Sequence, residues 1–278
     1  MSLRITVLGC GSSGGVPRIG GDWGACDPHN SKNRRRRCSL LVERIDRVGG
    51  GRTNVLVDTS PDIRDQLLGT GTRTLDGVLF THDHADHVHG IDDLRVVARN
   101  GGRRVDVYYD EGTGRTLKKR FAYCFETPAA SSYPSILNGH VLWPMHAVTI
   151  EGAGGPIQAV PFEQDHGDAP SLGFRFGGIA YSSDLMDLPE RSLEALKDLE
   201  IWIVDALRYS RHPSHFSVDD ALRWIDRVQP KRAVITNMHV DLDYETLKRE
   251  LPENIEPAYD GMVLETVCEL PEHLSETV

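Results

Sequence analysis

One short segment of the 278-residue chain concentrates side chains that bind metal ions. Residues 81–87 read Thr-His-Asp-His-Ala-Asp-His and follow an apolar run that predicts a buried strand. In an extended segment residues two apart point the same way, so His82 and His84 can bind one ion while Asp86 and His87 face another. Without an ion, each buried polar group left unpaired here would cost ~1–3 kcal/mol. The segment therefore predicts half of a two-metal site.

The apolar pattern along the rest of the chain predicts the elements that position this segment. Strands are expected near residues 3–8, 40–42, 55–57, 78–80, 105–109, 157–162, 172–176, 179–182, 201–205 and 233–236. Helices are expected at residues 63–69, 91–101, 113–121, 193–196 and 218–228. Strands that alternate with helices indicate an α/β protein. The absence of a sequence repeat or linker favours one domain over residues 1–278.

Three segments are less regular. Residues 9–15 hold four glycines after the first strand, but the spacing differs from a nucleotide-binding P-loop. Residues 34–37 are four arginines, which we interpret as a solvated face, although one or two could reach a substrate phosphate. Residues 123–143 lack periodicity and predict an ordered covering loop, over either a substrate or a partner subunit of a homodimer.

Composition limits the classes of partner. Acidic residues number 41 against 31 basic ones, a net charge of -10, which disfavours long nucleic acids and favours small substrates. No apolar run approaches the ~20 residues that span a bilayer, and the first residues lack a signal-peptide pattern, so we expect a cytoplasmic protein. The five cysteines are widely spaced and predict neither disulfides nor a cysteine zinc site.

The histidine-rich segment and three later residues resemble the motifs of the metallo-β-lactamase superfamily. His166 comes at the end of a later strand, Asp184 follows the strand near 179–182, and His239 follows the strand near 233–236. The resemblance implies a four-layer αβ/βα sandwich. It also implies one ion on His82, His84 and His166, a second on Asp86, His87 and His239, and Asp184 as the bridge. A hydroxide shared by the two ions would be the nucleophile of a hydrolase.

Within the superfamily the chain is most similar to the phosphoribosyl cyclic phosphate phosphodiesterases of phosphonate breakdown. The similar stretches are residues 9–17, 33–35, 58–62, 90–95, 212–217 and 258–262. In this subfamily a histidine before the last helix protonates the leaving alkoxide, and His215 matches it, with His212 as the alternative. We therefore expect His215, Asp86 and Asp184 as catalytic residues. We expect Ser12, Ser13, His215 and Asp260 to bind the substrate.

The chain departs from the subfamily at one point. Relatives carry a cysteine cluster and an additional histidine that hold a structural zinc, whereas here Cys26 stands alone and Leu242 lies where the histidine is expected. A four-ligand structural zinc at Cys26 is therefore not expected.

The sequence as a whole predicts a two-metal phosphodiesterase that hydrolyses a small nucleotide or sugar phosphodiester, including cyclic ones. Five imidazoles with two carboxylates suit zinc, and manganese or iron also fit so many oxygen ligands. Two alternatives use the same metal motifs. One is a ribonuclease Z-like RNA-processing enzyme, which normally needs a basic arm, and the other is a thioester or lactone hydrolase.

Overall fold

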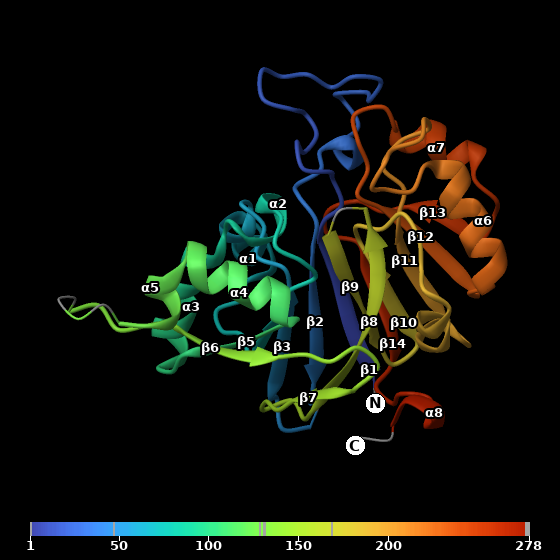
Figure 1. Cartoon of the computed structure of the whole chain (residues 1–278). Coiled ribbons are helices and arrows are strands. Elements are labelled where there is room, and N and C mark those ends of the chain that lie inside the picture. Colours follow the sequence, from blue (N-terminus) through green and yellow to red (C-terminus); the bar gives the residue numbers. More distant parts are fainter. Residues whose placement is uncertain (1, 47, 128, 130–131, 168, 276–278) are drawn as a thin grey trace.

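The strands of the protein form two seven-stranded sheets that pack face to face, with helices on the two outer sides (Figure 1). The computed structural model describes residues 2–46, 48–127, 129, 132–167 and 169–275. The arrangement confirms the predicted α/β class and the four-layer αβ/βα sandwich. Among the described residues, no helix has the length and apolar character needed to cross a membrane.

The strands follow one order in each sheet. The first sheet contains, in spatial order, β14 (Val263–Val267), β1 (Ser2–Gly9), β2 (Ser39–Ile45), β3 (Arg52–Val57), β4 (Gly77–Leu79), β5 (Val105–Tyr109) and β6 (Leu137–Val141). The second contains β7 (Val148–Ile150), β8 (Ile157–His166), β9 (Ala169–Phe176), β10 (Ile179–Ser182), β11 (Ile201–Asp205), β12 (Arg232–Thr236) and β13 (Ile255–Pro257). In these orders, both sheets have three antiparallel pairings followed by three parallel ones.

The helices divide between the two outer layers. The first sheet carries α1 (Ile63–Thr70), α2 (Ala85–Val88), α3 (Leu94–Gly101), α4 (Glu111–Arg120) and α5 (Ala122–Phe125) (Figure 1). The second carries α6 (Val218–Val228) and α7 (Tyr244–Glu250), while α8 (Glu272–Ser275) lies near the C-terminus. Short 3₁₀ helices cover Ser31–Asn33, Ile91–Asp93 and Glu190–Leu196. The helix predicted at residues 193–196 is therefore a 3₁₀ turn, too short to reach stable α-helical length.

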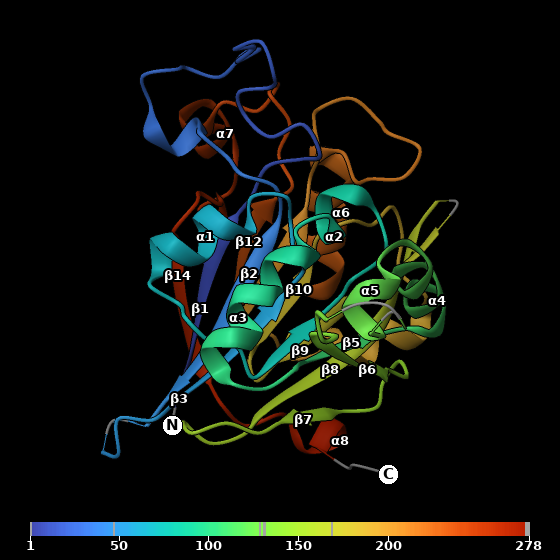
Figure 2. The same ribbon diagram turned by 90° about the vertical axis from the view of Figure 1, so that its left-hand side faces the viewer.

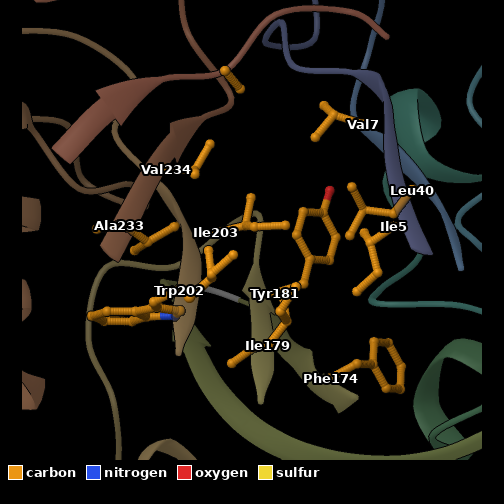
Figure 3. Packing of buried hydrophobic residues seen from close by; sticks show 14 of the residues in the cluster. Ile5, Val7, Leu40, Phe174, Ile179, Tyr181, Trp202, Ile203, Ala233 and Val234 are labelled. Carbon is orange, nitrogen blue, oxygen red and sulfur yellow. The ribbon is translucent and has the colours of Figure 1, made fainter. Parts of the chain in front are cut away.

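The core lies between the two sheets, where their inner faces share one apolar cluster. Ile5 and Leu40 of the first sheet face Tyr181 of β10 (Figure 3). Because β2 alternates its faces, Leu41 instead packs with the cluster beneath the helices. Both faces of the central strands are thus buried, and each fully buried large aliphatic or aromatic side chain contributes ~1.5–3 kcal/mol.

Residues 123–143 differ from the predicted covering loop. The described part holds α5 and the edge strand β6, while residues 128 and 130–131 lie outside the described residues. The strand Leu137–Val141 escaped prediction because its central residues are polar or glycine. Gly139 is required there, since a Cβ atom added to it would lie 1.7 Å from the Tyr109 hydroxyl oxygen. The packing of Tyr109 against β6 thus requires glycine at position 139, and the local sequence pattern does not reveal this requirement.

Gly90, just after α2, fixes the distance between the ligand segment and the β3–α1 connection. Its N–H donates to the Thr59 carbonyl at 2.9 Å, and a Cβ atom added here would lie 2.1 Å from the Ser60 carbonyl oxygen. We expect Gly90→Ala to lower the free energy of unfolding by about 1–3 kcal/mol, because backbone must move to admit the methyl group. Urea denaturation measures this loss.

Gly69→Ala in α1 is the matched control. A Cβ atom at Gly69 meets nothing within 4 Å, so the alanine should leave the unfolding free energy unchanged or raise it by up to ~1 kcal/mol. Equal stability of the two variants would contradict the close approach at Gly90.

Candidate metal centre

Polar side chains from both sheets meet at one end of the sandwich. The segment after β4 supplies His82 to His87, β8 ends at His166, and Asp184 follows β10 by two residues. The β1–β2 connection and the loop between β11 and α6 lie at this same end, opposite β7 and α8 (Figures 1 and 2). Folding thus brings together residues that are distant in the sequence.

The first group consists of His82, His84, His166 and Asp184, whose ligand atoms all lie within 4.8 Å of one another. The His166 Nε2 atom lies 3.3 Å from His84 Nδ1 and 3.7 Å from Asp184 Oδ2. His82 Nε2 lies 3.8 Å from the same carboxylate oxygen. All members except His84 are buried, so three imidazoles and one carboxylate oxygen converge on one small volume.

The second group consists of Asp86, His87 and Asp184. His87 Nε2 lies 3.1 Å from Asp184 Oδ1 and 3.5 Å from Asp86 Oδ2. The two oxygens of Asp184 therefore face different groups, Oδ2 toward His82 and His166 and Oδ1 toward His87. A carboxylate in this position can bridge two ions.

The other ring nitrogen of each buried histidine is held by a partner that was not singled out from the sequence. Asp58 Oδ2 lies 2.7 Å from His87 Nδ1, and Thr81 Oγ1 lies 2.9 Å from His82 Nδ1. His166 Nδ1 donates to the carbonyl of Ser214 at 2.6 Å. Such partners set the tautomer and aim Nε2 at the metal position. Asp58 directly follows the buried strand β3 and lies in the 58–62 stretch that resembles the subfamily, but neither signal indicated its role beside His87.

Burial and neighbouring charges set the protonation of the group. Burial lowers the pKa of His82 well below the usual value, and His87 lowers it further. Burial likewise lowers the pKa of His166. Burial would raise the pKa of Asp184, but the His87 imidazole outweighs it and holds that pKa well below its usual range. His82 and His166 are therefore in the neutral form that binds metal, beside an ionised carboxylate. Burial lowers the pKa of His87, but Asp184 outweighs this effect and raises it well above the usual value, so His87 would have to release a proton to bind an ion.

Two observations test whether these residues fit divalent ions. Among the described residues, none forms a well-aligned hydrogen bond with the buried Nε2 atoms of His82 and His87, although Asp184 Oδ1 lies 3.1 Å from His87 Nε2. Such buried nitrogen atoms are costly unless something else binds them. Zinc bonds of about 2.0–2.2 Å in tetrahedral geometry place ligand atoms about 3.3–3.6 Å apart. The spacings of 3.1–3.8 Å around Asp184 lie close to this value. The residues present therefore fit a pair of divalent ions.

His239 lies in the wall of the same cavity, but the structure does not bring its ring into either group of described residues. Its Nε2 atom lies 3.3 Å from Nη1 of Arg18, and its Nδ1 atom lies 3.1 Å from Asp241 Oδ2. The predicted second-ion set is thus represented here by Asp86, His87 and Asp184.

A cavity of about 270 Å³ opens over the two groups. Among the predicted substrate-binding residues, Ser12, Ser13 and His215 line it. Asp260 does not, because its carboxylate accepts hydrogen bonds from Cys10 N and from the backbone and Nε of Arg36. None of the described residues between 123 and 143 lines this cavity, so the substrate cover is not seen here, and the alternative, a partner interface, stays a prediction.

His215 is the better placed of the two candidate proton donors. Its Nε2 lies 3.9 Å from Asp184 Oδ2, and its Nδ1 lies 2.9 Å from Oδ2 of the fully buried Asp205. Burial raises the pKa of Asp205. Burial lowers the pKa of His215, but Asp205 outweighs this effect and raises it above the usual value. His212 instead contacts Ser214, and its ring centroid lies 5.0 Å from that of His215.

The arginine run is not the solvated face that the sequence predicted. Arg35 is buried, with Nη2 donating to the carbonyl of Leu242 at 2.6 Å. Arg36 pairs with Asp260 at 3.0 Å and Arg37 with Asp62 at 3.0 Å. Only Arg34 is exposed. Asp260 is distant in the sequence, and Asp62 is the N-cap residue at the start of α1. The run of arginines alone therefore gave no sign of either partner.

Cys26 lies in a small apolar cluster with Val16 and Val240. Its Sγ atom is 3.4 Å from the carbonyls of Val240 and Leu242, and Nη1 of Arg35 lies 3.8 Å away. The guanidinium group of Arg35 is therefore one of the neighbours of this thiol.

Replacement of Asp58 tests the support given to His87. We expect Asp58→Asn to weaken metal affinity about 10- to 100-fold, because the amide is a poorer partner for the imidazole N–H than a carboxylate. Metal titration of the chelator-treated variant measures the change. Asp76→Asn, at a carboxylate remote from the centre, should keep wild-type affinity. Unchanged affinity in Asp58→Asn would contradict this role.

Comparison with known proteins agrees with the geometry. The family model described as "Beta-lactamase superfamily domain" matches residues 53–238. A solved structure described as a new diphosphatase from the PhnP family has 36% sequence identity and a TM-score of 0.85, covering 97% of this chain and 99% of that one. The short form of human tRNase Z has a TM-score of 0.59 at 16% identity, covering 94% and 98%, a likeness in fold.

A protein of Porphyromonas gingivalis named octanoyltransferase is 31% identical over 263 residues, which is 94% of this chain. The chain spans about half of that protein, 51% of its length. The family match, the PhnP-family likeness and the clustered histidines and carboxylates lead to one conclusion. The chain belongs to the β-lactamase superfamily and resembles a diphosphatase of the PhnP family.

Proposed function

We propose that this protein is a phosphodiesterase that hydrolyses a small nucleotide or sugar phosphodiester, including cyclic ones. The PhnP-family diphosphatase, 36% identical over nearly the whole chain, supports chemistry at phosphorus. The cavity of about 270 Å³ supports a small substrate. The observation that carries the proposal is the His215–Asp205 pair beside Asp184.

We propose the following ligands for two divalent ions. His82, His84 and His166 hold one, Asp86 and His87 hold the other, and Asp184 bridges them. His239, which lines the same cavity, would complete the second set. Divalent ions bound here lower the pKa of water and neutralise charge on a phosphoryl group. Nitrogen and oxygen donors in these numbers suit zinc or manganese.

His215 holds a proton where a leaving oxygen would depart. Asp205 accepts a hydrogen bond from Nδ1–H of His215. In the imidazolium form Nε2 also carries a proton, on the side of the ring that lines the cavity. Asn237 keeps Asp184 in place by donating to its Oδ1 at 3.2 Å. An alkoxide leaves with difficulty unless it is protonated, whereas a thiolate leaves readily without a proton. A proton donor built into the fold therefore favours phosphodiesters over thioesters.

Turnover of model substrates tests the reaction class. We expect metal-loaded protein to cleave bis(p-nitrophenyl) phosphate, and chelation to abolish this activity until zinc or manganese is restored. Asp184→Ala should lose at least ~10³-fold in kcat, because the bridging carboxylate is removed. A thioester and a lactone are assayed in parallel, and activity limited to them would refute the phosphodiesterase. Cleavage of precursor tRNA in preference to small diesters would favour the ribonuclease Z-like alternative.

The dependence on the leaving group tests the role of His215. With the methyl ester of a nucleotide, His215→Ala should lower kcat by about 10²- to 10⁴-fold. The p-nitrophenyl ester should suffer much less, because p-nitrophenolate needs no proton to leave. Asp205→Asn should follow the same selective pattern, since Asp205 positions His215.

His146→Ala is the control for these two variants, because the His146 side chain is exposed and its ring contacts the carbonyl of Pro144. Equal losses for both esters in His215→Ala would indicate a positioning role without proton transfer and would count against the mechanism.

A further inference from the structure

One buried side chain of the β1–β2 connection is charged but does not line the metal cavity. Arg35 is 2% exposed. Its neighbours Arg36 and Arg37 pair with aspartates, whereas no carboxylate among the described residues forms an ion pair with the Arg35 guanidinium. A cation buried without a direct counter-charge is strongly destabilising unless hydrogen bonds satisfy it. The acceptors that offset this cost indicate the role of Arg35.

The guanidinium bridges the two ends of one turn. Its Nη1 donates to the carbonyl of His239 at 3.3 Å, and its Nη2 donates to the carbonyl of Leu242 at 2.6 Å. The N–H of Leu242 closes the turn by donating to the same His239 carbonyl at 3.2 Å. The N–H of His239 donates to the carbonyl of Leu207, which lines the metal cavity. The main chain of His239 is thus held through both its N–H and its carbonyl.

Arg35 is itself fixed by the start of α7, which lies beside the β1–β2 connection (Figures 1 and 2). Nη2 also donates to Oδ1 of Asn33 at 3.1 Å, and Nδ2 of Asn33 donates to Oδ2 of Asp243 at 2.7 Å. Burial would raise the pKa of Asp243, but hydrogen bonds from the Thr246 backbone and from Asn33 lower it to about 2. An ionised carboxylate therefore lies one side chain away from the buried cation.

The shape of the guanidinium suits this position. Its NH₂ groups lie in one plane and reach acceptors on both ends of the turn at once, whereas a lysine ammonium is a single point charge. Lysine at position 35 would leave at least one buried carbonyl without its donor. The surroundings are also tight, because a Cβ atom added to Gly24 would lie 2.7 Å from the Val240 carbonyl oxygen in the middle of the turn. The turn therefore depends on Arg35 for its conformation.

We propose that Arg35 is a positioning residue for the second metal ion, because its buried guanidinium holds the main chain of His239 at the wall of the metal cavity. The inference rests on the proposed function for the assignment of His239 to that ion. Without His239, the described residues supply only Asp86, His87 and the shared Asp184 to the second ion. The first ion takes no ligand from this turn, so loss of Arg35 affects the two ions differently.

Metal titration of the chelator-treated protein tests this role without relying on turnover. We expect the wild type to bind a pair of zinc ions. Arg35→Lys should weaken the second ion about 10- to 100-fold, as for other residues that orient a metal ligand, and leave the first ion unchanged. His239→Ala should weaken the same ion. Adding Arg35→Lys to His239→Ala should cause little further loss, because the arginine acts through the histidine.

Arg175→Lys is the matched control. Arg175 is also buried, at 1% exposure, and donates to the backbone carbonyls of Gly177, Ala195 and Lys197, none of which lines the metal cavity. This variant should lose thermal stability, as unfolding measures, and keep both zinc affinities. If Arg35→Lys does not fold, Asn33→Ser removes one acceptor of the Arg35 guanidinium and should give a smaller loss of the second ion alone.

The role of Arg35 is overturned if Arg35→Lys, or Asn33→Ser in its place, leaves the second ion unchanged or weakens both ions equally. Losses that add in the double variant also overturn it, because the arginine would then not act through His239. A wild type that binds a single ion contradicts it too, while turnover of bis(p-nitrophenyl) phosphate decides the proposed function separately. If the titrations give the expected pattern but no phosphodiester is cleaved, the proposed function fails and the role of Arg35 stands.

Discussion

The buried carboxylate of Asp184 is the constraint on which the rest of the site depends. An ionised carboxylate excluded from water is strongly destabilising unless charges and hydrogen bonds surround it. Here Asn237 donates to one oxygen, and imidazoles from both sheets approach the two oxygens. Those imidazoles in turn need Asp58, Thr81 and a loop carbonyl behind them. One buried charge thus determines where the ends of several strands must lie.

The two sheets supply these strand ends in an equivalent way. Each sheet has the same succession of antiparallel and parallel pairings, so β3 and β4 correspond to β10 and β11. Asp58 follows β3 and Asp184 follows β10, while the histidine segment follows β4 and Asp205 ends β11. The two halves share this order of pairings although the sequence shows no repeat. The centre lies where the two halves face each other.

The fold was largely predictable because its signals are local. Apolar runs marked most of the strands, and α6 was predicted with its bounds, helped by the Ser217 cap. The histidine segment was visible for the same reason. Residues whose role depends on distant partners were not predictable. Arg35 to Arg37 were interpreted as solvated, and neither Asp58 nor Asp205 was assigned a role in the site. Asp260 looked like a substrate ligand but fastens Cys10 to Arg36 across 224–250 residues of sequence. Contacts between residues so far apart in the sequence leave no periodic pattern from which they could be predicted.

The candidate metal centre is built from residues that are far apart in the sequence, so ions bound there would stabilise the folded state. His84 and His166 meet across 82 residues of sequence, so an unfolded chain retains only the short segment around residues 82–87. Ions that fit the complete set bind the native state far better than that fragment. By mass action, each tenfold rise in free ion above its dissociation constant then adds about 1.4 kcal/mol to native stability. In the metal-loaded protein that we propose, removal of the ions would therefore lower the stability of the fold as well as abolish turnover.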